Sequence, residues 1–88
     1  MIGTARIGDL AGDALAFAGE ALTLTLTRAF APGAPIRVRL VIDGADFTVE
    51  ARAIGSKRRD DGTFEVRVRL VNLSREDRLR LEATNATR

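Results

Sequence analysis

The sequence predicts an all-β fold, a small antiparallel β-barrel of five to six strands with one short C-terminal α-helix. Apolar and polar residues alternate along three neighbouring segments, at residues 36–42, 47–53 and 64–70. Alternation with a period of two is typical of a half-buried strand, because successive side chains point to opposite faces of the sheet. Asp43-Gly44 and Asp61-Gly62 lie between these segments and favour the tight turns of β-hairpins.

The first hairpin has a register that can be derived from its turn. A two-residue turn at Asp43-Gly44 pairs Ile42 with Ala45, Leu40 with Phe47, Val38 with Val49 and Ile36 with Ala51 on one face, and Arg37 with Glu50 and Arg39 with Thr48 on the other. A shift by one residue would move every apolar side chain into water. In the second hairpin Ala51 and Ala53 must face Val66, Val68 and Leu70. This requirement predicts an even number of loop residues.

The N-terminal third alternates between strand and turn signals. Residues 2–8 predict a short strand, residues 8–13 a turn, residues 14–17 a second strand, and Gly19-Glu20 a tight turn. Residues 21–27 alternate strictly, so Leu22, Leu24 and Leu26 are expected in the core. The two prolines in residues 28–35 predict a loop across one end of the sheet, with Phe30 as its apolar plug.

The pattern changes to a helical one after residue 74. Ser74 is placed as an N-cap, and Asp77 three residues later completes a capping-box-like pair. Glu76 and Arg80 are spaced as an i,i+4 ion pair. Leu79 and Ala83 share one face, which predicts a helix at about residues 75–83 that covers the mouth of the barrel. Residues 84–88 are expected to fray.

Length and composition indicate one domain that spans residues 1–88, with strands within residues 2–71. The chain has 88 residues, no cysteine, and no apolar run of membrane-spanning length. No signal peptide is visible, so we expect a cytoplasmic protein that does not contact membranes. Net charge is only +2, so the basic isoelectric point is no argument for nucleic acid. Whether the chain belongs to a longer protein stays open.

Residue types that carry catalysis are scarce. The chain has no His and no Cys, and Ser56 and Ser74 therefore lack the usual base partners of a nucleophile. Asp60-Asp61 is an adjacent carboxylate pair, and it falls at a hairpin tip where a solvated turn is the simpler interpretation. We expect no enzyme activity, no metal and no cofactor.

Two groups of basic residues form the candidate partner surface. Arg39, Arg52, Arg67 and Arg69 are expected on the outer face of the sheet, and Lys57, Arg58 and Arg59 on a loop. Arg37 is matched by Glu50, which leaves a positive excess suited to an acidic protein partner. Two alternatives stay open: carboxylates from neighbouring strands neutralise the face, and the run at residues 57–59 only solubilises a hairpin tip.

In the order of its elements the chain resembles the PilZ domains of bacterial signalling proteins. The resemblance covers roughly residues 2–81. It is carried by the Pro-Gly loop and strand at residues 30–38, the strand run at residues 66–71, and the short helix that follows at residues 74–79. It implies a six-stranded antiparallel barrel. Ligand-binding members of this family hold cyclic di-GMP through two arginines four residues apart and through an Asp/Asn-x-Ser-x-x-Gly motif.

Both ligand motifs are broken in this sequence. No two arginines are four residues apart, and the nearest match to the second motif begins at Asp9, with Ala11 in place of Ser and Ala14 in place of Gly. The loss of the hydroxyl removes a hydrogen bond, and the loss of Gly adds a Cβ where the ligand would approach. The resemblance therefore implies a degenerate, adaptor-type module that works by protein–protein interaction and does not bind cyclic di-GMP. A cyclic di-GMP effector, an RNA-binding basic barrel and a homodimer stay open as alternatives.

Overall fold

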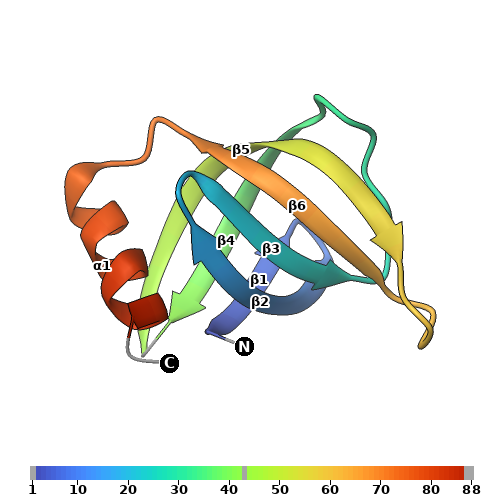
Figure 1. Cartoon of the computed structure of the whole chain (residues 1–88), viewed down its shortest axis with the longest axis horizontal. Helices are drawn as coiled ribbons and strands as arrows, with labels where there is room; N and C mark the ends of the chain where they lie inside the picture. Colours follow the sequence, from blue (N-terminus) through green and yellow to red (C-terminus); the bar gives the residue numbers. More distant parts are fainter. Residues whose placement is uncertain (1, 43, 87–88) are drawn as a thin grey trace.

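The chain folds into a closed β-barrel with one helix across its end (Figure 1). The computed structural model describes residues 2–42 and 44–86, with the side chains of Phe47 and of residues 83–86 left out. The strands are β1 (Gly3–Ile7), β2 (Leu10–Ala18), β3 (Ala21–Leu26), β4 (Pro35–Ile42), β5 (Ala45–Arg58) and β6 (Phe64–Val71), and the helix is α1 (Arg75–Ala86).

The strands follow one another around the barrel in the order β1-β2-β3-β6-β5-β4, and β1 pairs with β4 to close it. Every pair of neighbouring strands is antiparallel. The predicted fold class is therefore confirmed, with six strands among the described residues. The closing ladder between β1 and β4 is short, because only Thr4, Ala5 and Arg6 pair with Val41, Leu40 and Arg39.

The core is built from the apolar half of each alternating strand. Its fully buried large side chains are Phe17, Leu22, Leu24, Leu26, Val38, Leu40, Val66, Val68 and Leu81. Among the described residues no polar or charged side chain is buried in it. The barrel interior is thus a packed hydrophobic centre, and any binding chemistry has to lie on the outside.

The register of the first hairpin is confirmed pair by pair from Ile42–Ala45 to Ile36–Ala51. Gly44 takes a φ of 79°, a left-handed value that a glycine adopts without strain. Asp43 and the side chain of Phe47 lie outside the described residues. The register was predicted correctly because the apolar alternation and the two-residue turn require the same pairing.

The expected even-numbered loop of the second hairpin is wrong. Ala51 pairs with Leu70 and Ala53 with Val68 as predicted, but Arg58 pairs with Phe64 and the loop spans residues 59–63. A β-bulge between Ala53 and Gly55 inserts one extra residue on β5 and reverses the parity. The bulge turns Ile54 outward, where its side chain is 48% exposed.

The predicted turn at residues 8–13 is also wrong in length. Only Gly8 and Asp9 form the turn, with Gly8 at a φ of 57°, and β2 already begins at Leu10. The small residues in this segment suggested a loop. In the structure they belong to β2, where it packs closely between β1 and β3. A Cβ on Gly12 would lie 1.8 Å from the Thr25 carbonyl oxygen, so only glycine fits there.

Phe30 plugs the end of the barrel opposite the helix, as predicted. Its ring packs against the core, and its backbone is fixed by Ser56, whose Oγ accepts from the Phe30 N–H at 2.9 Å and donates to the Phe30 carbonyl at 3.0 Å. Arg28 lies over the ring at 5.8 Å from its centre. The loop before β4 is therefore tied to β5.

Helix α1 begins as predicted, because the Asp77 N–H donates to Ser74 Oγ at 3.1 Å. Two expectations about it are wrong. The helix continues to Ala86, so residues 84–86 are helical, while residues 87–88 lie outside the described part. Leu81 enters the core with 0% exposure, whereas Leu79 is 56% exposed. The side of α1 that faces the barrel also carries Asp77 and Arg78, which are half-buried. Because these two residues are polar, the apolar residues alone did not indicate which side faces inward.

Candidate functional site: an arginine patch beside a groove

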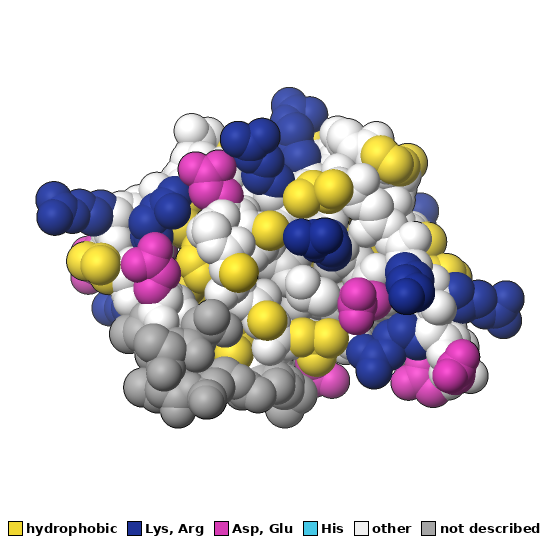
Figure 2. Space-filling model, viewed as in Figure 1, with side chains coloured by type: hydrophobic (Ala, Val, Ile, Leu, Met, Phe, Trp, Pro, Cys, Tyr) yellow, Lys and Arg dark blue, Asp and Glu magenta, His cyan; other side chains and the backbone are white. Residues whose placement is uncertain are grey.

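The predicted partner surface divides into three separate groups on the outside of the barrel. Arg39 lies on β4, residues 57–59 lie toward the hairpin tip far from the helix (Figure 1), and Arg52, Arg67 and Arg69 lie together on β5 and β6. We call the last three the arginine patch. Figure 2 shows basic side chains gathered over β5 and β6.

Arg39 is already compensated within the chain. Its Nη2 lies 2.7 Å from Asp46 Oδ2, and its Nε donates to both carboxylate oxygens at 3.1 Å. These hydrogen bonds from Arg39 lower the pKa of the Asp46 carboxyl below its ordinary value. Arg39 therefore adds little to the positive field of the face.

The arginine patch places like charges directly opposite one another. Arg52 and Arg69 are cross-strand partners on β5 and β6, and Arg67 lies two residues from Arg69, opposite Gly55. Like charges at opposed positions in a sheet destabilise it. A Cβ on Gly55 would meet nothing within 4 Å, so open space lies beside Arg67.

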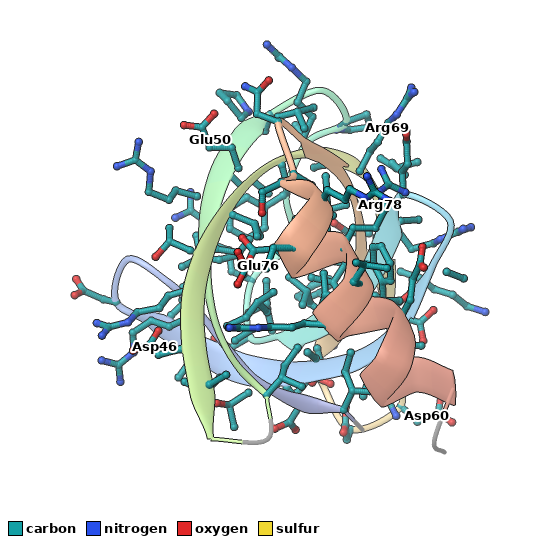
Figure 3. The ribbon with its side chains drawn as sticks, turned by 90° about the vertical axis from the view of Figure 1, so that its left-hand side faces the viewer. Asp46, Glu50, Asp60, Arg69, Glu76 and Arg78 are labelled. Atoms are coloured by element: carbon teal, nitrogen blue, oxygen red, sulfur yellow. The ribbon has the colours of Figure 1, made fainter. Side chains whose placement is uncertain are left out.

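Glu20 forms ion pairs with two arginines at the edge of this patch. Glu20 Oε2 accepts from Arg69 Nη2 at 3.3 Å, and Glu20 Oε1 accepts from Arg78 Nη2 at 3.5 Å. Figure 3 shows Arg69 and Arg78 reaching the same side of the molecule from β6 and α1. Among the described residues Arg52 Nη1 donates only to the Gly33 carbonyl at 3.2 Å, and Arg67 makes no ion pair. A positive excess therefore remains.

A groove of about 480 Å³ adjoins the patch and shares Arg52 with it. Its lining consists of Pro35, Ile36, Arg37, Glu50, Ala51, Arg52 and Val71. Glu50 is held by Arg37 at 3.5 Å and accepts from Asn72 Nδ2 at 3.5 Å, as predicted for the Arg37 pair. Sequence reasoning missed the groove because its apolar sides, Pro35 and Val71, lie at strand ends, outside the alternating runs.

Asp61, the second carboxylate at the hairpin tip, stabilises the turn itself. Asp61 Oδ1 accepts from the Thr63 hydroxyl at 2.6 Å and from the Thr63 N–H at 3.0 Å. These two hydrogen bonds lower the pKa of the Asp61 carboxyl. Asp61 is thus a turn residue, and Lys57 lies opposite Glu65. The prediction that residues 57–59 lie on a loop is wrong in part, because β5 continues through Lys57 and Arg58 and only Arg59 belongs to the loop.

The residues of the degenerate ligand motif do not share a surface. Asp9 lies in the turn between β1 and β2, Ala11 is exposed on β2, and Ala14 is buried with 0% exposure. In the closed barrel β2 is three strands away from β5 in either direction. The motif residues and the arginine patch therefore lie on opposite sides of the barrel.

Groups for other kinds of chemistry are not assembled in the described part of the chain. Phe17 is buried, while Phe30 and Phe64 are half-buried, so none of these rings forms a stacking platform beside the arginines. Within residues 2–42 and 44–86 no three His, Cys, Asp or Glu side chains come together as metal ligands would. No described helix has the length and apolar character to cross a bilayer.

Comparison with known proteins gives no relative for this chain. No family model, curated protein or solved structure matches it. The arginine patch and its groove are therefore the features from which a function can be inferred.

Proposed function

We propose that this protein is a PilZ-like adaptor module of the cytoplasm, which catalyses no reaction and binds an acidic segment of a partner protein through the arginine patch. The observation that carries the proposal is the opposed pair Arg52 and Arg69, with Arg67 unpaired among the described residues. A sheet that holds like charges together loses stability, and an acidic ligand restores it. The closed six-stranded barrel, which the resemblance to PilZ domains implies, supports the proposal.

The chemistry of the patch suits carboxylates. A guanidinium group presents a planar fork of donors that matches both oxygens of a carboxylate, and a β-strand backbone holds it in place. Because the patch is exposed, its attraction should accelerate association and weaken steeply as salt is added.

Cyclic di-GMP is not the proposed ligand. The chain lacks the paired arginines of the ligand-binding PilZ domains, and the position of their motif glycine holds Ala14, whose side chain is buried. RNA is also not favoured, because single-stranded RNA recognition relies on exposed aromatic rings that stack on bases.

The test compares charge reversal inside and outside the patch. A variant with Arg52→Glu and Arg67→Glu should lose binding to a synthetic Glu-rich peptide. A matched variant with Arg6→Glu and Arg75→Glu carries the same net charge on β1 and α1 and should keep it. Titration of each folded protein at several salt concentrations gives the affinity and its salt dependence.

Three outcomes would refute the proposed function. The first is unchanged peptide binding by the patch variant, which would make the patch an inert exterior. The second is saturable binding of cyclic di-GMP at micromolar concentration in calorimetry. The third is tighter binding of a short single-stranded RNA than of the acidic peptide.

A further inference from the structure

The arginine patch and the groove form one composite surface. The cross-strand pairs place Pro35, Arg52 and Arg69 in one row across β4, β5 and β6. The neighbouring row consists of Arg37, Glu50 and Val71. Arg52 belongs both to the patch and to the lining of the groove. A ligand that reaches Arg52 therefore meets charge on the β6 side and apolar surface on the β4 side.

Glu50 makes the arginine patch and the groove differ in the kind of side chain that each favours. Its carboxylate lines the groove and is exposed there. Arg37 also lines the groove and pairs with Glu50 at 3.5 Å, so these two charges offset each other and leave no excess positive charge there for an acidic side chain. The same side chain on the β6 side would meet Arg52 and Arg69. An acidic residue is directed to the patch, and the groove is left for an uncharged side chain.

The floor of the groove suits an apolar side chain. Pro35 and Val71 lie at its two sides, and Ile36 and Ala51 lie beneath them in the core. Its volume of about 480 Å³ leaves room for a large aliphatic or aromatic group. Burial of apolar atoms there would add affinity that salt does not screen.

The chain itself shows that a carboxylate can bind at the patch. Glu20 already accepts two hydrogen bonds from Arg69, at 3.3 and 3.4 Å. It is shared with Arg78 on α1, so it satisfies Arg69 incompletely. A partner carboxylate placed between Arg52 and Arg69 would use donors that Glu20 leaves available.

We propose that the docking element of the partner is an extended protein segment in which an acidic residue and a large apolar residue lie two positions apart. The inference rests on the proposed function, because it assumes that the patch binds an acidic partner. A carboxylate between Arg52 and Arg69 lies about one and a half strand spacings from Pro35, or roughly 7 Å. Two residues of an extended chain cover about the same distance. The acidic side chain then lies on the patch while the apolar one enters the groove.

The experiment uses two synthetic peptides of equal charge. One has the sequence Ser-Gly-Glu-Glu-Thr-Leu-Ser-Gly, and the other replaces its Leu by Ser. Each is titrated into the ¹⁵N-labelled chain of 88 residues, and NMR chemical shifts of the backbone and of the arginine Nε–H groups give the affinity and location. We expect the Leu peptide to bind about tenfold more tightly, because its isobutyl group is buried.

Two variants with a matched position separate the groove from the patch. Pro35→Gln fills the groove with an uncharged polar side chain and should abolish the advantage of the Leu peptide. Pro32→Gln makes the same change on the exposed loop before β4 and should preserve it. Arg52→Gln should weaken both peptides by at least about tenfold, because a charged hydrogen-bonding partner is lost.

The outcomes also separate this inference from the proposed function. Equal affinities for the two peptides, or an advantage of the Leu peptide that persists in Pro35→Gln, overturn the two-part docking element while the acidic-partner function stands. Binding of neither peptide, or binding that Arg52→Gln leaves unchanged, overturns both.

Discussion

Replacement of Leu81 by Ala tests how the helix is held on the barrel. Among residues 75–82, Leu81 is the one side chain that is fully buried, with 0% exposure. The other link described above is the exposed contact between Arg78 and Glu20 at 3.5 Å, and exposed ion pairs contribute about 1 kcal/mol or less. Leu81 should therefore supply most of the free energy that docks α1.

The expected loss can be estimated from burial. A buried Leu→Ala change costs about 2–5 kcal/mol, because the transfer free energy is lost and a cavity remains. An isolated helix of this length is marginal in water, so the undocked α1 should also unfold. For a domain of this size the melting temperature should fall by at least about 8 °C, at roughly 4–8 °C per kcal/mol.

Urea unfolding followed by circular dichroism measures the effect. Leu79→Ala is the matched control, since it makes the same chemical change in the same helix at a side chain that is 56% exposed. The control should change the free energy of unfolding by no more than about 0.5 kcal/mol. Equal midpoints for the two variants would refute the role assigned to Leu81.

Three further predictions concern stability. Gly12→Ala should destabilise the fold by at least about 2 kcal/mol, because of the clash with the Thr25 carbonyl, whereas Gly55→Ala, with open space around it, should be neutral or stabilise by up to about 1 kcal/mol in urea unfolding. Ser74→Ala removes the N-cap of α1 and should cost about 1 kcal/mol in the same assay; no change would mean that the cap is not needed. Asp46→Asn should lower the melting temperature at pH values above 3.8, the ordinary pKa of the carboxyl group. The difference in melting temperature from the wild type should shrink as the pH falls further, because a carboxylate whose pKa is lowered in the folded state stabilises the fold only while it is ionised. A gap that widens on acidification would contradict this sign.

The sequence predicted most features that depend on local pattern. The alternation in residues 36–42 and the Asp43-Gly44 turn gave the register of the first hairpin, which the structure confirms. The three leucines of β3 were placed in the core, and Ser74 at the start of the helix. Local patterns succeed in these cases because the side of a strand that is buried, and the residue that caps a helix, are decided by near neighbours along the chain.

The candidate site was only partly predictable. Arg52, Arg67 and Arg69 were expected on one outer face, and they do lie together on β5 and β6. Neither Glu20 nor the groove with its apolar sides was expected. Glu20 is 49 residues from Arg69 and 58 from Arg78 in sequence, and no local pattern connects them.

Tertiary structure alone decided the features that depend on strand neighbours. Pairing of β1 with β4 closed the barrel, and the bulge at Ala53 and Gly55 reversed the parity of the second hairpin. The inward position of Leu81 depended on how α1 crosses the barrel end. The physical reason is the same in each case. Periodicity records which side of each segment avoids water, but the choice of partner comes from packing all segments at once around a single core.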